Sequence, residues 1–555
     1  MVVVLLALSA VVATTPAAAQ RVRGTVRDSA SGEPIPGAVV WLTDSAGNFL
    51  ARSVGDEKGR FAVMRLVGSA RLHAVRIGFR PQELAFDPAA NDTMFTLRMS
   101  TLPPLLAPMS ASGRRVCGGA KGTGEALDAW EQARAALLAS VVSREATPPS
   151  IRVVSFSRKI DALTGQVTHQ SVRSRTQLGD RSYVAGRPGW AFAEEGYMLE
   201  AKNGERTFFA PDEGVLLDPT FAGTHCMHVI EGRGPRRDEV GIAFEPVGEH
   251  GRDTLVDITG VLWLRRGTPE LRSMEFQYTS LEPAARGSGG EIVFRSMPNG
   301  APMIERWSIK SAQIAFDNPS RAGELRHRLP DRVQRGSSRL LAYHEFGGAV
   351  AWSDWKGTHV PGTSLREVTG QVTQLNGRPG VGARVWLENT SDTTTTDSLG
   401  YFVIPDVVPG RYAVRAADST LAAVGVTRGW AGVDATKQRV EPVLIFYFGV
   451  LEVLGARCHG QVIPDGTGIL LGRVTDADGG AVLSARIEAH WSQTSPAADQ
   501  LKPDRTADVD DDGRFAVCGA PMTQPVRLHG VSDAGTADMR VEWASRLMAV
   551  TLIVR

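Results

Sequence analysis

The pattern closest to a metal site is the segment His228-Val229-Ile230-Glu231. Imidazole and carboxylate are both zinc ligands, and His-x-x-Glu is a spacing that zinc hydrolases use. A working site would also need a third ligand and a catalytic carboxylate, and the surrounding residues are typical of a strand. We therefore expect His225 and His228 to flank Cys226 on a half-exposed strand. A metal-dependent hydrolase built on His225, His228 and Glu231 stays open as the third functional alternative.

An acidic run, Asp508-Val509-Asp510-Asp511-Asp512-Gly513, offers the hard oxygen ligands that Ca²⁺ prefers. The run lacks the spaced ligands and the closing Glu of a calcium loop. A turn explains the same residues, because Asp caps its own backbone and Gly accepts a positive φ. We favour the turn over a calcium site.

Trp190, Trp352 and Trp355 carry rings that could stack on a sugar. Trp352 and Trp355 lie between the central region and the second repeat described below, so we favour packing between domains. The sequence holds no His-Glu-x-x-His, Gly-x-Ser-x-Gly, phosphate-binding Gly-Lys-Ser/Thr loop or dinucleotide fingerprint. These observations predict a protein that is not an enzyme and has no cofactor or metal.

The chain has four cysteines: Cys117, Cys226, Cys458 and Cys518. An even, sparse count in an exported chain is typical of structural disulfides. We predict the pairs Cys117–Cys226 and Cys458–Cys518, because each pairing stays inside one proposed region. Four buried free thiols are the alternative. A zinc site is disfavoured because no two of these cysteines have finger-like spacing.

The first twenty residues are typical of a secretory signal. The apolar run from Val2 to Val12 has the length of a signal-peptide core and is too short to span a bilayer. Ala17-Ala18-Ala19 are small residues that signal peptidase accepts, so we predict cleavage before Gln20. No Lys or Arg precedes the apolar run, and a buried first strand is the alternative. Export places the protein in the periplasm, at the outer membrane or outside the cell.

Charge and length exclude some classes of partner. Lys and Arg total 61 against 60 Asp and Glu, whereas a nucleic-acid partner requires a strong basic field. A length of 555 residues predicts three to five domains, and 59 Gly with 31 Pro favours short strands joined by tight turns. The apolar stretch from Val443 to Leu454 is too short to cross a membrane; it predicts a buried strand leading into a helical turn with Cys458. We expect no transmembrane segment after signal cleavage.

One pattern occurs three times: Gly-x-Val, then alternating apolar residues that begin with Ala, then Asp-x-x-Gly-x-Phe. The copies begin at Gly24, Gly370 and Gly472, and their phenylalanines are Phe61, Phe402 and Phe515. Gly is expected where a side chain would crowd a neighbouring strand, and alternation gives a strand one inward face. Asp-x-x-Gly forms a turn before Phe enters the core. The spacing agrees except for an insertion before the last Asp of the third copy.

This repeat resembles the carboxypeptidase regulatory-like domain, a small Greek-key β-sandwich of transthyretin-like or prealbumin-like shape. The resemblance covers about 20–100, 366–430 and 465–555 and is weakest in the third copy. It implies architecture and an exported location, because such modules accompany catalytic domains, surface proteins and outer-membrane receptors but carry no catalytic residues. The stretch from Phe208 to Cys226 also resembles secreted bacterial proteins that bear the same N-terminal module.

The central region starts with a predicted helix. Leu127, Trp130, Leu137, Leu138 and Val141 fall on one helical face. From Ile151 to about Asp317 the pattern changes to strands in a long antiparallel meander. In element order, one helix followed by a meander is similar to the unclosed barrels of periplasmic lipoprotein carriers.

The predicted fold is mainly β and multidomain, with three small Greek-key β-sandwich modules and a central antiparallel β-meander domain with one helix. We expect the following order: a signal peptide at 1–19, sandwich modules at 20–105, 366–430 and 465–555, a linker at 106–122, the central domain at 123–345 and a connector at 431–464. The leading hypothesis is a non-catalytic exported protein, periplasmic or cell-surface, whose modules are spacers or binding units for a protein or carbohydrate ligand at the cell envelope. The alternative is a periplasmic carrier that holds a lipid or other apolar ligand in the central half-barrel.

Overall fold

The computed structural model describes residues 21–86, 94–102, 116–117, 125–180, 184, 186–202, 205–248, 255–266, 270–316, 338–375, 377–418, 429–447, 458–491, 503–544 and 546–555. The predicted signal peptide and most of the predicted linker lie outside these residues. The chain divides into two compact units: Met1–Ala162 with Arg173–Ser364, and Leu163–Val172 with Leu365–Arg555. Each unit is described by itself.

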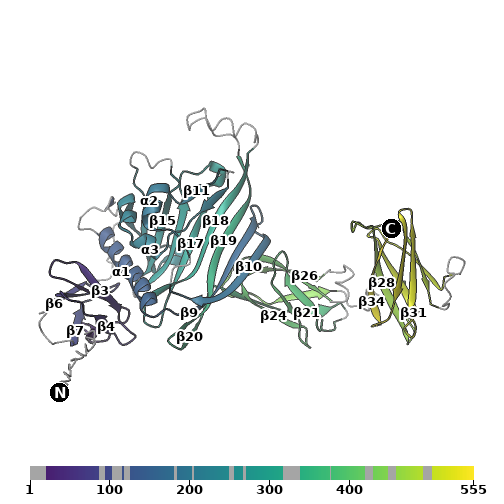
Figure 1. The fold of residues 1–555 in the computed structure, drawn as a ribbon, viewed down its shortest axis with the longest axis horizontal. Helices are drawn as coiled ribbons and strands as arrows, with labels where there is room; N and C mark the ends of the chain where they lie inside the picture. The colour runs from purple at the N-terminus through teal and green to yellow at the C-terminus, as the bar shows by residue number, and fades with distance from the viewer. Residues whose placement is uncertain are drawn as a thin grey trace, which may run out of the picture. The chain divides into compact units, whose positions relative to one another are not determined.

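Three modules share one strand topology (Figure 1). Module 1 comprises β1 (Arg21–Asp28), β2 (Val39–Thr43), β3 (Phe49–Val54), β4 (Arg60–Met64), β5 (Arg71–Val75), β6 (Gln82–Ala85) and β7 (Met94–Met99). Module 2 comprises β21 (Arg366–Gln374), β22 (Arg384–Leu387), β23 (Thr393–Thr395), β24 (Tyr401–Val407), β25 (Arg411–Ala417), β26 (Gly429–Asp434) and β27 (Val443–Tyr447). Module 3 comprises β28 (Thr467–Thr475), β29 (Arg486–His490), β30 (Arg505–Asp508), β31 (Arg514–Pro521), β32 (Val526–Ser532), β33 (Gly535–Val541) and β34 (Leu547–Ile553).

Each module consists of a three-stranded and a four-stranded sheet. The orders are β4-β1-β7 with β3-β2-β5-β6, β24-β21-β27 with β23-β22-β25-β26, and β31-β28-β34 with β30-β29-β32-β33. In every copy the first strand pairs antiparallel with the fourth and parallel with the seventh. The predicted mainly β, multidomain fold with three sandwich modules is therefore confirmed, and the third copy agrees in every strand pairing.

The repeated glycine is explained by the phenylalanine opposite it. The pairs in register are Gly24 with Phe61, Gly370 with Phe402, and Gly472 with Phe515. A Cβ on Gly24 or on Gly370 would lie 2.7 Å from the Cζ atom of the facing ring, and one on Gly472 would collide with the ring of Phe515. A side chain on the first strand would therefore meet the phenylalanine ring, and in modules 1 and 2 also the carbonyl oxygen of Phe95 or Val443, which is the crowding that the sequence predicted.

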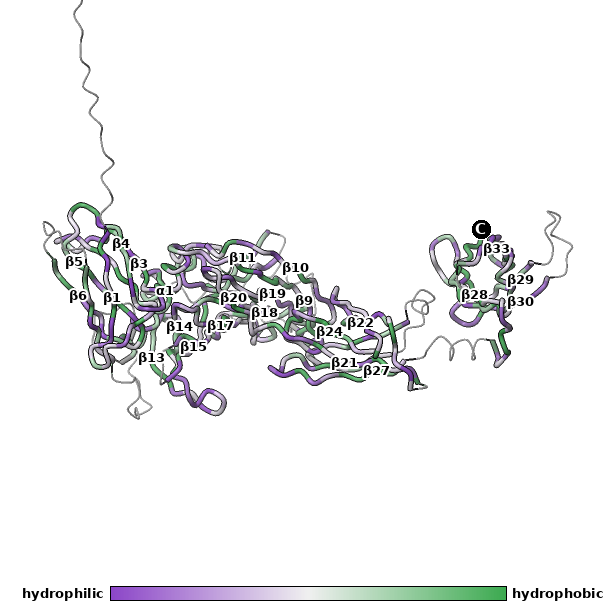
Figure 2. Tube along the Cα trace, turned by 90° about the horizontal axis from the view of Figure 1, so that it is seen from below, coloured by the Kyte–Doolittle hydropathy of each residue, from purple (hydrophilic) through white to green (hydrophobic). Residues whose placement is uncertain are grey.

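Alternation along the strands separates the module core from solvent, and Figure 2 shows hydrophobic and hydrophilic residues interchanging along each module. In module 1 the core contains Ala38, Val40 and Leu42, which point inward from β2 and the residue before it. Their counterparts in module 2 are Ala383, Val385 and Leu387. The side chains between these positions point away from the core and differ between modules.

Most of β26 and all of β27 lie beyond residue 430, where the sequence predicted a connector. β27 alternates, so Ile445 and Tyr447 are buried while Leu444 and Phe446 are 51% and 53% exposed. The expectation of a buried strand at this position is therefore only half right, because a strand at the outer layer of a sandwich has one solvent face. The predicted helical turn after it falls on residues outside the described part of the chain.

The central region is built on one large sheet, all of which belongs to the first unit except the start of β10. It contains β8 (Val116–Cys117), β9 (Ser150–Asp161), β10 (Val167–Leu178), β13 (His225–Glu231), β14 (Glu239–Pro246), β15 (Ile258–Arg265), β16 (Leu271–Tyr278), β17 (Gly289–Ser296), β18 (Pro302–Phe316), β19 (Ser338–Trp355) and β20 (Thr358–Pro361). The order is β10-β9-β19-β18-β17-β16-β15-β14-β13-β8, with β20 paired to β19. Strands β13 to β19 follow each other in sequence and in space, so a meander is present. It runs from His225 to Trp355 rather than from Ile151 to about Asp317 as predicted, because β9 pairs with β19 at the other end.

Helices cover one face of this sheet (Figure 1). They are α1 (Glu125–Ala146), α2 (Gly189–Glu195), α3 (Glu213–Leu217) and α4 (Pro219–Thr224), accompanied by the hairpin β11 (Met198–Glu200) and β12 (Arg206–Phe208) and the short 3-10 turns Gly234–Arg236 and Pro283–Ala285. The sequence predicted α1 but not the three shorter helices. Those helices have only five to seven residues, too few to show a helical period.

Helix α1 is buried on two sides rather than along one apolar face. Trp130 and Leu137 pack with the sheet, whereas Ala139 and Val142 pack with Val39 of module 1. Of the predicted apolar face, Leu127, Leu138 and Val141 are only partly buried. The second contact was not predicted because small residues such as Ala139 give no periodic signal.

Candidate functional site

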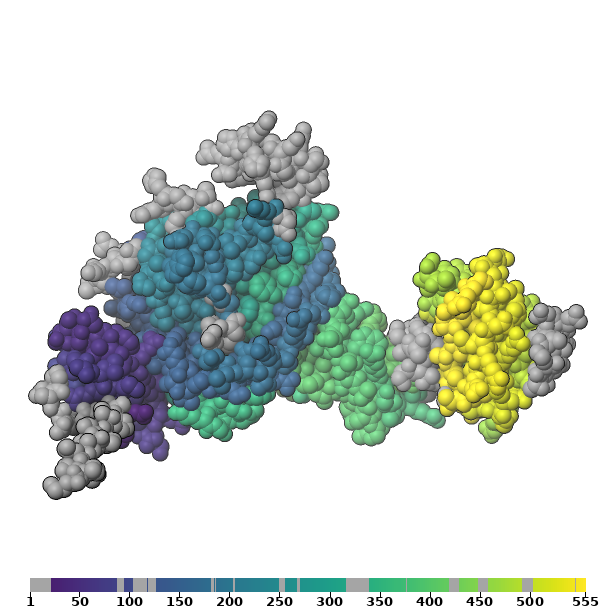
Figure 3. Space-filling view, viewed as in Figure 1, coloured from purple at the N-terminus to yellow at the C-terminus, as the bar shows by residue number. Residues whose placement is uncertain are grey.

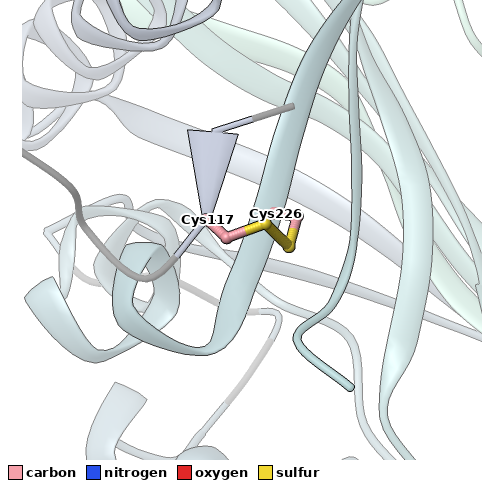
Figure 4. The surroundings of a disulfide bond; sticks show 2 residues. All are labelled: Cys117 and Cys226. Carbon is pink, nitrogen blue, oxygen red and sulfur yellow. A yellow bond between two sulfur atoms is a disulfide. The ribbon is translucent and has the colours of Figure 1, made fainter. Parts of the chain in front are cut away.

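Both predicted disulfides are present. Cys117 on β8 lies opposite Cys226 on β13, with Cα atoms 3.9 Å apart (Figure 4). The second bond joins Cys458 to Cys518 on β31, with Cα atoms 5.9 Å apart. Around it Ile469 and Leu471 form a small apolar cluster on the outer side of the three-stranded sheet of module 3. The first bond attaches an edge strand to the central sheet, and the second attaches the residues before module 3 to that module.

His225 belongs to the core. Its side chain is 1% exposed, its Nε2 lies 3.3 Å from Oδ1 of the equally buried Asp257, and its Nδ1 lies 3.1 Å from the carbonyl oxygen of Phe221. The imidazole also stacks on the Phe221 ring with centroids 4.2 Å apart. The expectation of a half-exposed His225 is wrong, because α4 covers this end of β13. His228 is half-buried, as expected.

His228 and Glu231 cannot bind one ion together. Both lie on β13, where successive side chains point to opposite faces of the sheet. Residues three apart on a strand therefore diverge, although the same spacing on a helix would bring them together. In the described part of the chain, no three His, Cys, Asp or Glu side chains group as a metal site.

The acidic run of module 3 forms the repeat turn. Oδ1 of Asp510 accepts hydrogen bonds from the backbone N–H groups of Asp512 and Arg514, at 3.0 and 2.8 Å. Asp56 and Asp397 do the same in modules 1 and 2. In Asp56, burial alone would raise the carboxyl pKa, but hydrogen bonds from Arg60 and Lys58 and the Arg60 charge outweigh it, so the pKa is lowered. The Asp510 carboxylate thus serves the turn, which explains this residue without a calcium ion.

The three tryptophans named from the sequence do not form one platform. Trp355 is 4% exposed and packs with Met303 and Val350 of the central sheet, not between domains as the sequence predicted. Trp352 lies three residues before it on the same strand and therefore faces the other side of the sheet. Trp190 on α2 is 54% exposed. Trp355 therefore cannot stack on a sugar, and the three tryptophans do not act as one set.

A buried ion pair links α1 to α3. Glu213 is fully buried; its Oε1 accepts a hydrogen bond from Ser140 at 3.0 Å and lies 3.4 Å from the guanidinium of Arg144. Burial raises the pKa of Glu213; the Arg144 charge opposes this rise, and the Asp212 charge adds to it. This cluster is enclosed by the helices and is a structural element of the core.

The outer faces of the four-stranded sheets are the surfaces on which the modules differ. One row of four side chains in register crosses each sheet at the same position of the repeat. The rows are Arg52-Trp41-His73-Glu83 in module 1, Thr393-Trp386-Arg415-Trp430 in module 2, and Thr506-Glu488-His529-Asp538 in module 3. Trp386 was not predicted as a site residue, although its place between inward Val385 and Leu387 marks it as outward.

The outer faces of the three-stranded sheets differ as well. In module 1 this face carries Arg21, Arg23, Arg27, Arg60 and Arg98. In module 2 it carries Tyr401, Val403, Leu444 and Phe446, each 45–53% exposed. In module 3 the apolar cluster around the Cys458–Cys518 bond covers part of it. One scaffold therefore presents a basic, an apolar and a partly covered face.

The model of the carboxypeptidase regulatory-like domain matches residues 21–100 and 367–441. Two of the three modules therefore match this domain. The match covers the four-stranded sheets of both, and it extends past residue 430 to include β26. Module 3 lies outside the matched residues, yet its strand pairings are those of the two matched modules.

Among solved structures, the Streptococcal ancillary pilin is 10% identical, with 44% of this chain and 92% of the pilin covered at a TM-score of 0.15. The shaft pilin spaA from Lactobacillus rhamnosus GG is 10% identical over 34% of this chain and 97% of its own, with a TM-score of 0.14. The Bacillus anthracis TIE protein is 11% identical over 64% and 63%, with a TM-score of 0.14. Similarities of this size carry no argument about function. No curated protein matches the chain.

Proposed function

We propose that this chain is a non-catalytic exported protein of the cell envelope in which modules 2 and 3 are binding units. The observation that supports it most is the contrast between conserved module cores and divergent outer rows. Three copies keep the Gly–Phe pair, the Asp turn and every strand pairing, while no two outer rows carry the same four side chains. Trp41 and Trp386 are equivalent, but module 3 has Glu488 at that position. A repeated scaffold with different surfaces suits recognition of different partners.

Module 1 has a different role in this proposal, because its outer face is used within the chain. Gln132 of α1 accepts a hydrogen bond from the N–H of Gly78, and Arg76 donates to the carbonyl of Gly300 at 3.0 Å. In the space-filling view the purple surface of module 1 adjoins the blue surface of the central region (Figure 3). Module 1 and the central region thus pack together, and in this proposal module 1 is a spacer rather than a binding unit.

The two alternatives have less support. For a carrier, the helix-covered face of the sheet would have to admit an apolar ligand, yet Trp130, Phe192 and Phe221 from three helices pack there against the sheet residues Phe244 and Phe276. For a hydrolase, His228 and Glu231 diverge and His225 is enclosed. No described helix is long and apolar enough to cross a membrane.

Two measurements test the proposal. A tagged full chain produced in the source bacterium should fractionate with the periplasm or envelope. Protease added outside the cytoplasm should cleave the chain only after the chain has been exported. Purified chain supplied with Zn²⁺ should hydrolyse ester, peptide and glycoside substrates no faster than a His228→Ala control. A cytoplasmic location, or turnover that the His228 variant abolishes, would overturn the proposal.

A further inference from the structure

The outer row of module 2 has the composition of an interaction surface. Trp386, Arg415 and Trp430 lie side by side on β22, β25 and β26, in register. Neighbouring strands are about 4.8 Å apart, so the two rings stand roughly 10 Å from each other across the arginine. Trp430 is 62% exposed and the Arg415 side chain is 30% exposed. Tryptophan and arginine are the residues most enriched where protein interfaces gain their binding energy.

The neighbouring positions leave room beside these rings and add positive charge. The next row along β25 and β26 contains Ala413 and Gly432, and a Cβ on Gly432 would meet no atom within 4 Å. Arg384 lies on the same face, with its guanidinium 5.8 Å from the Trp386 ring. Arg415 forms an ion pair of 2.8 Å with Glu388. Glu388 thus compensates the Arg415 charge, and Arg384 is the cation of this face that attracts an anionic group.

Module 1 shows what this face binds inside the same chain. Trp41 occupies the position of Trp386, and the outward residues Val39, Val54 and Val75 join it in the apolar cluster with α1. Helix α1 contributes Leu138, Ala139 and Val142, spaced along one side of the helix. At the margin, Arg52 of β3 binds Glu145 of α1 at 2.7 Å. The docked element is a helix with small apolar residues and a carboxylate that reaches an arginine of the sheet.

We propose that the Trp386-Arg415-Trp430 row of module 2 is the docking face for an acidic amphipathic helix of a protein partner. The tryptophan rings cover the apolar side of the helix, as Trp41 does in module 1. Arg384 binds one of its carboxylates, because guanidinium and carboxylate match in shape and charge. This proposal deepens the proposed function, on which it rests, by naming the surface and the class of partner.

A direct test uses a labelled peptide with the sequence of α1, residues 125–146, as the probe. Its binding to the full chain is followed by fluorescence anisotropy. Because the chain's own α1 already fills the site on module 1, binding of the peptide reports on module 2. The double variant Trp386→Ala/Trp430→Ala should bind the peptide at least about tenfold more weakly. Trp190→Ala removes a comparably exposed tryptophan outside module 2 and should bind like the wild type. Arg384→Glu should weaken binding, and a peptide with Glu145→Lys should bind the wild type more weakly.

Specific outcomes overturn the proposal. The first is that the wild type does not bind the peptide. The second is that the double variant binds it equally well and has an unchanged unfolding midpoint. The third is that the double variant still binds the peptide but loses self-association or glycan binding. Capture from envelope extracts separates the two proposals. If wild type and double variant retain the same proteins, the docking face is wrong while the binding function stands; if the wild type retains none, the proposed function fails.

Discussion

Modules 1 and 2 have the same strand pairings and equivalent core residues, but the outer faces of their four-stranded sheets meet different surroundings. At one position of the repeat Val39 is fully buried against α1 and Arg384 is exposed to solvent. The next residue in each module, Val40 after Val39 and Val385 after Arg384, is completely buried in its module core. The inward half of the pattern is therefore set by the module itself, and the outward half by whatever lies on that sheet.

The largest effect is expected from removing a disulfide. Each unit contains one of the two bonds, so the two units can be destabilised separately. The pairs close chain segments with sequence separations of 109 and 60, and chain-entropy reasoning gives each about 4 to 5 kcal/mol. Cys458→Ser/Cys518→Ser should destabilise module 3 by about 4 kcal/mol, measured by urea unfolding. Non-reducing peptide maps should show both cross-links in the wild type, and free thiols at all four positions would contradict the structure.

The difference between the outer faces of modules 1 and 2 is tested by placing a carboxylate at the equivalent outward position of each, Val39 and Arg384. Val39→Glu places a carboxylate between module 1 and α1 and should cost about 3 kcal/mol or more in unfolding free energy. Arg384→Glu puts the same group on the open face of module 2 and should change stability by no more than about 0.5 kcal/mol. Thermal melts of both variants check this. Equal destabilisation would mean that the two faces do not differ as described.

The conserved glycine tests what the modules have in common. Gly370→Ala brings a methyl group against the Phe402 ring and the Val443 backbone, and should destabilise module 2 by about 2 kcal/mol. Gly24→Ala should have a similar effect in module 1, because it meets Phe61 and the Phe95 backbone in the same way. Gly432→Ala is the matched control, since its Cβ has open space. Denaturant unfolding that shows no difference from this control would refute the Gly–Phe explanation.

The smallest effect concerns the pH dependence of the first unit. Burial raises the pKa of Glu213 above its ordinary value of 4.5, so above pH 4.5 the folded state holds a proton that the unfolded state releases. Stability therefore falls as the pH rises from 4.5 toward the raised pKa. Glu213→Gln removes this dependence, and the melting temperature of the variant relative to the wild type should increase from pH 4 to pH 7. A constant difference would show that Glu213 does not titrate as inferred.

The sequence by itself determined the module. Gly24, Ala38, Asp56 and Phe61 repeat with the spacing of a strand, a second strand and a turn, and each acts through contacts inside its own copy. The disulfide partners could also be predicted, because each pair lies within one region. Local patterns of this kind need no information about distant parts of the chain.

Only the tertiary structure decided which outward faces are covered. The segment around Val39 and Trp41 and the segment around Arg384 and Trp386 have the same alternation, yet α1, nearly a hundred residues away in the sequence, lies on the first. His225 was misjudged for the same reason, since its burial depends on α4 and Asp257. Alternation states which side of a strand a residue occupies, whereas exposure depends on long-range packing that no local period records.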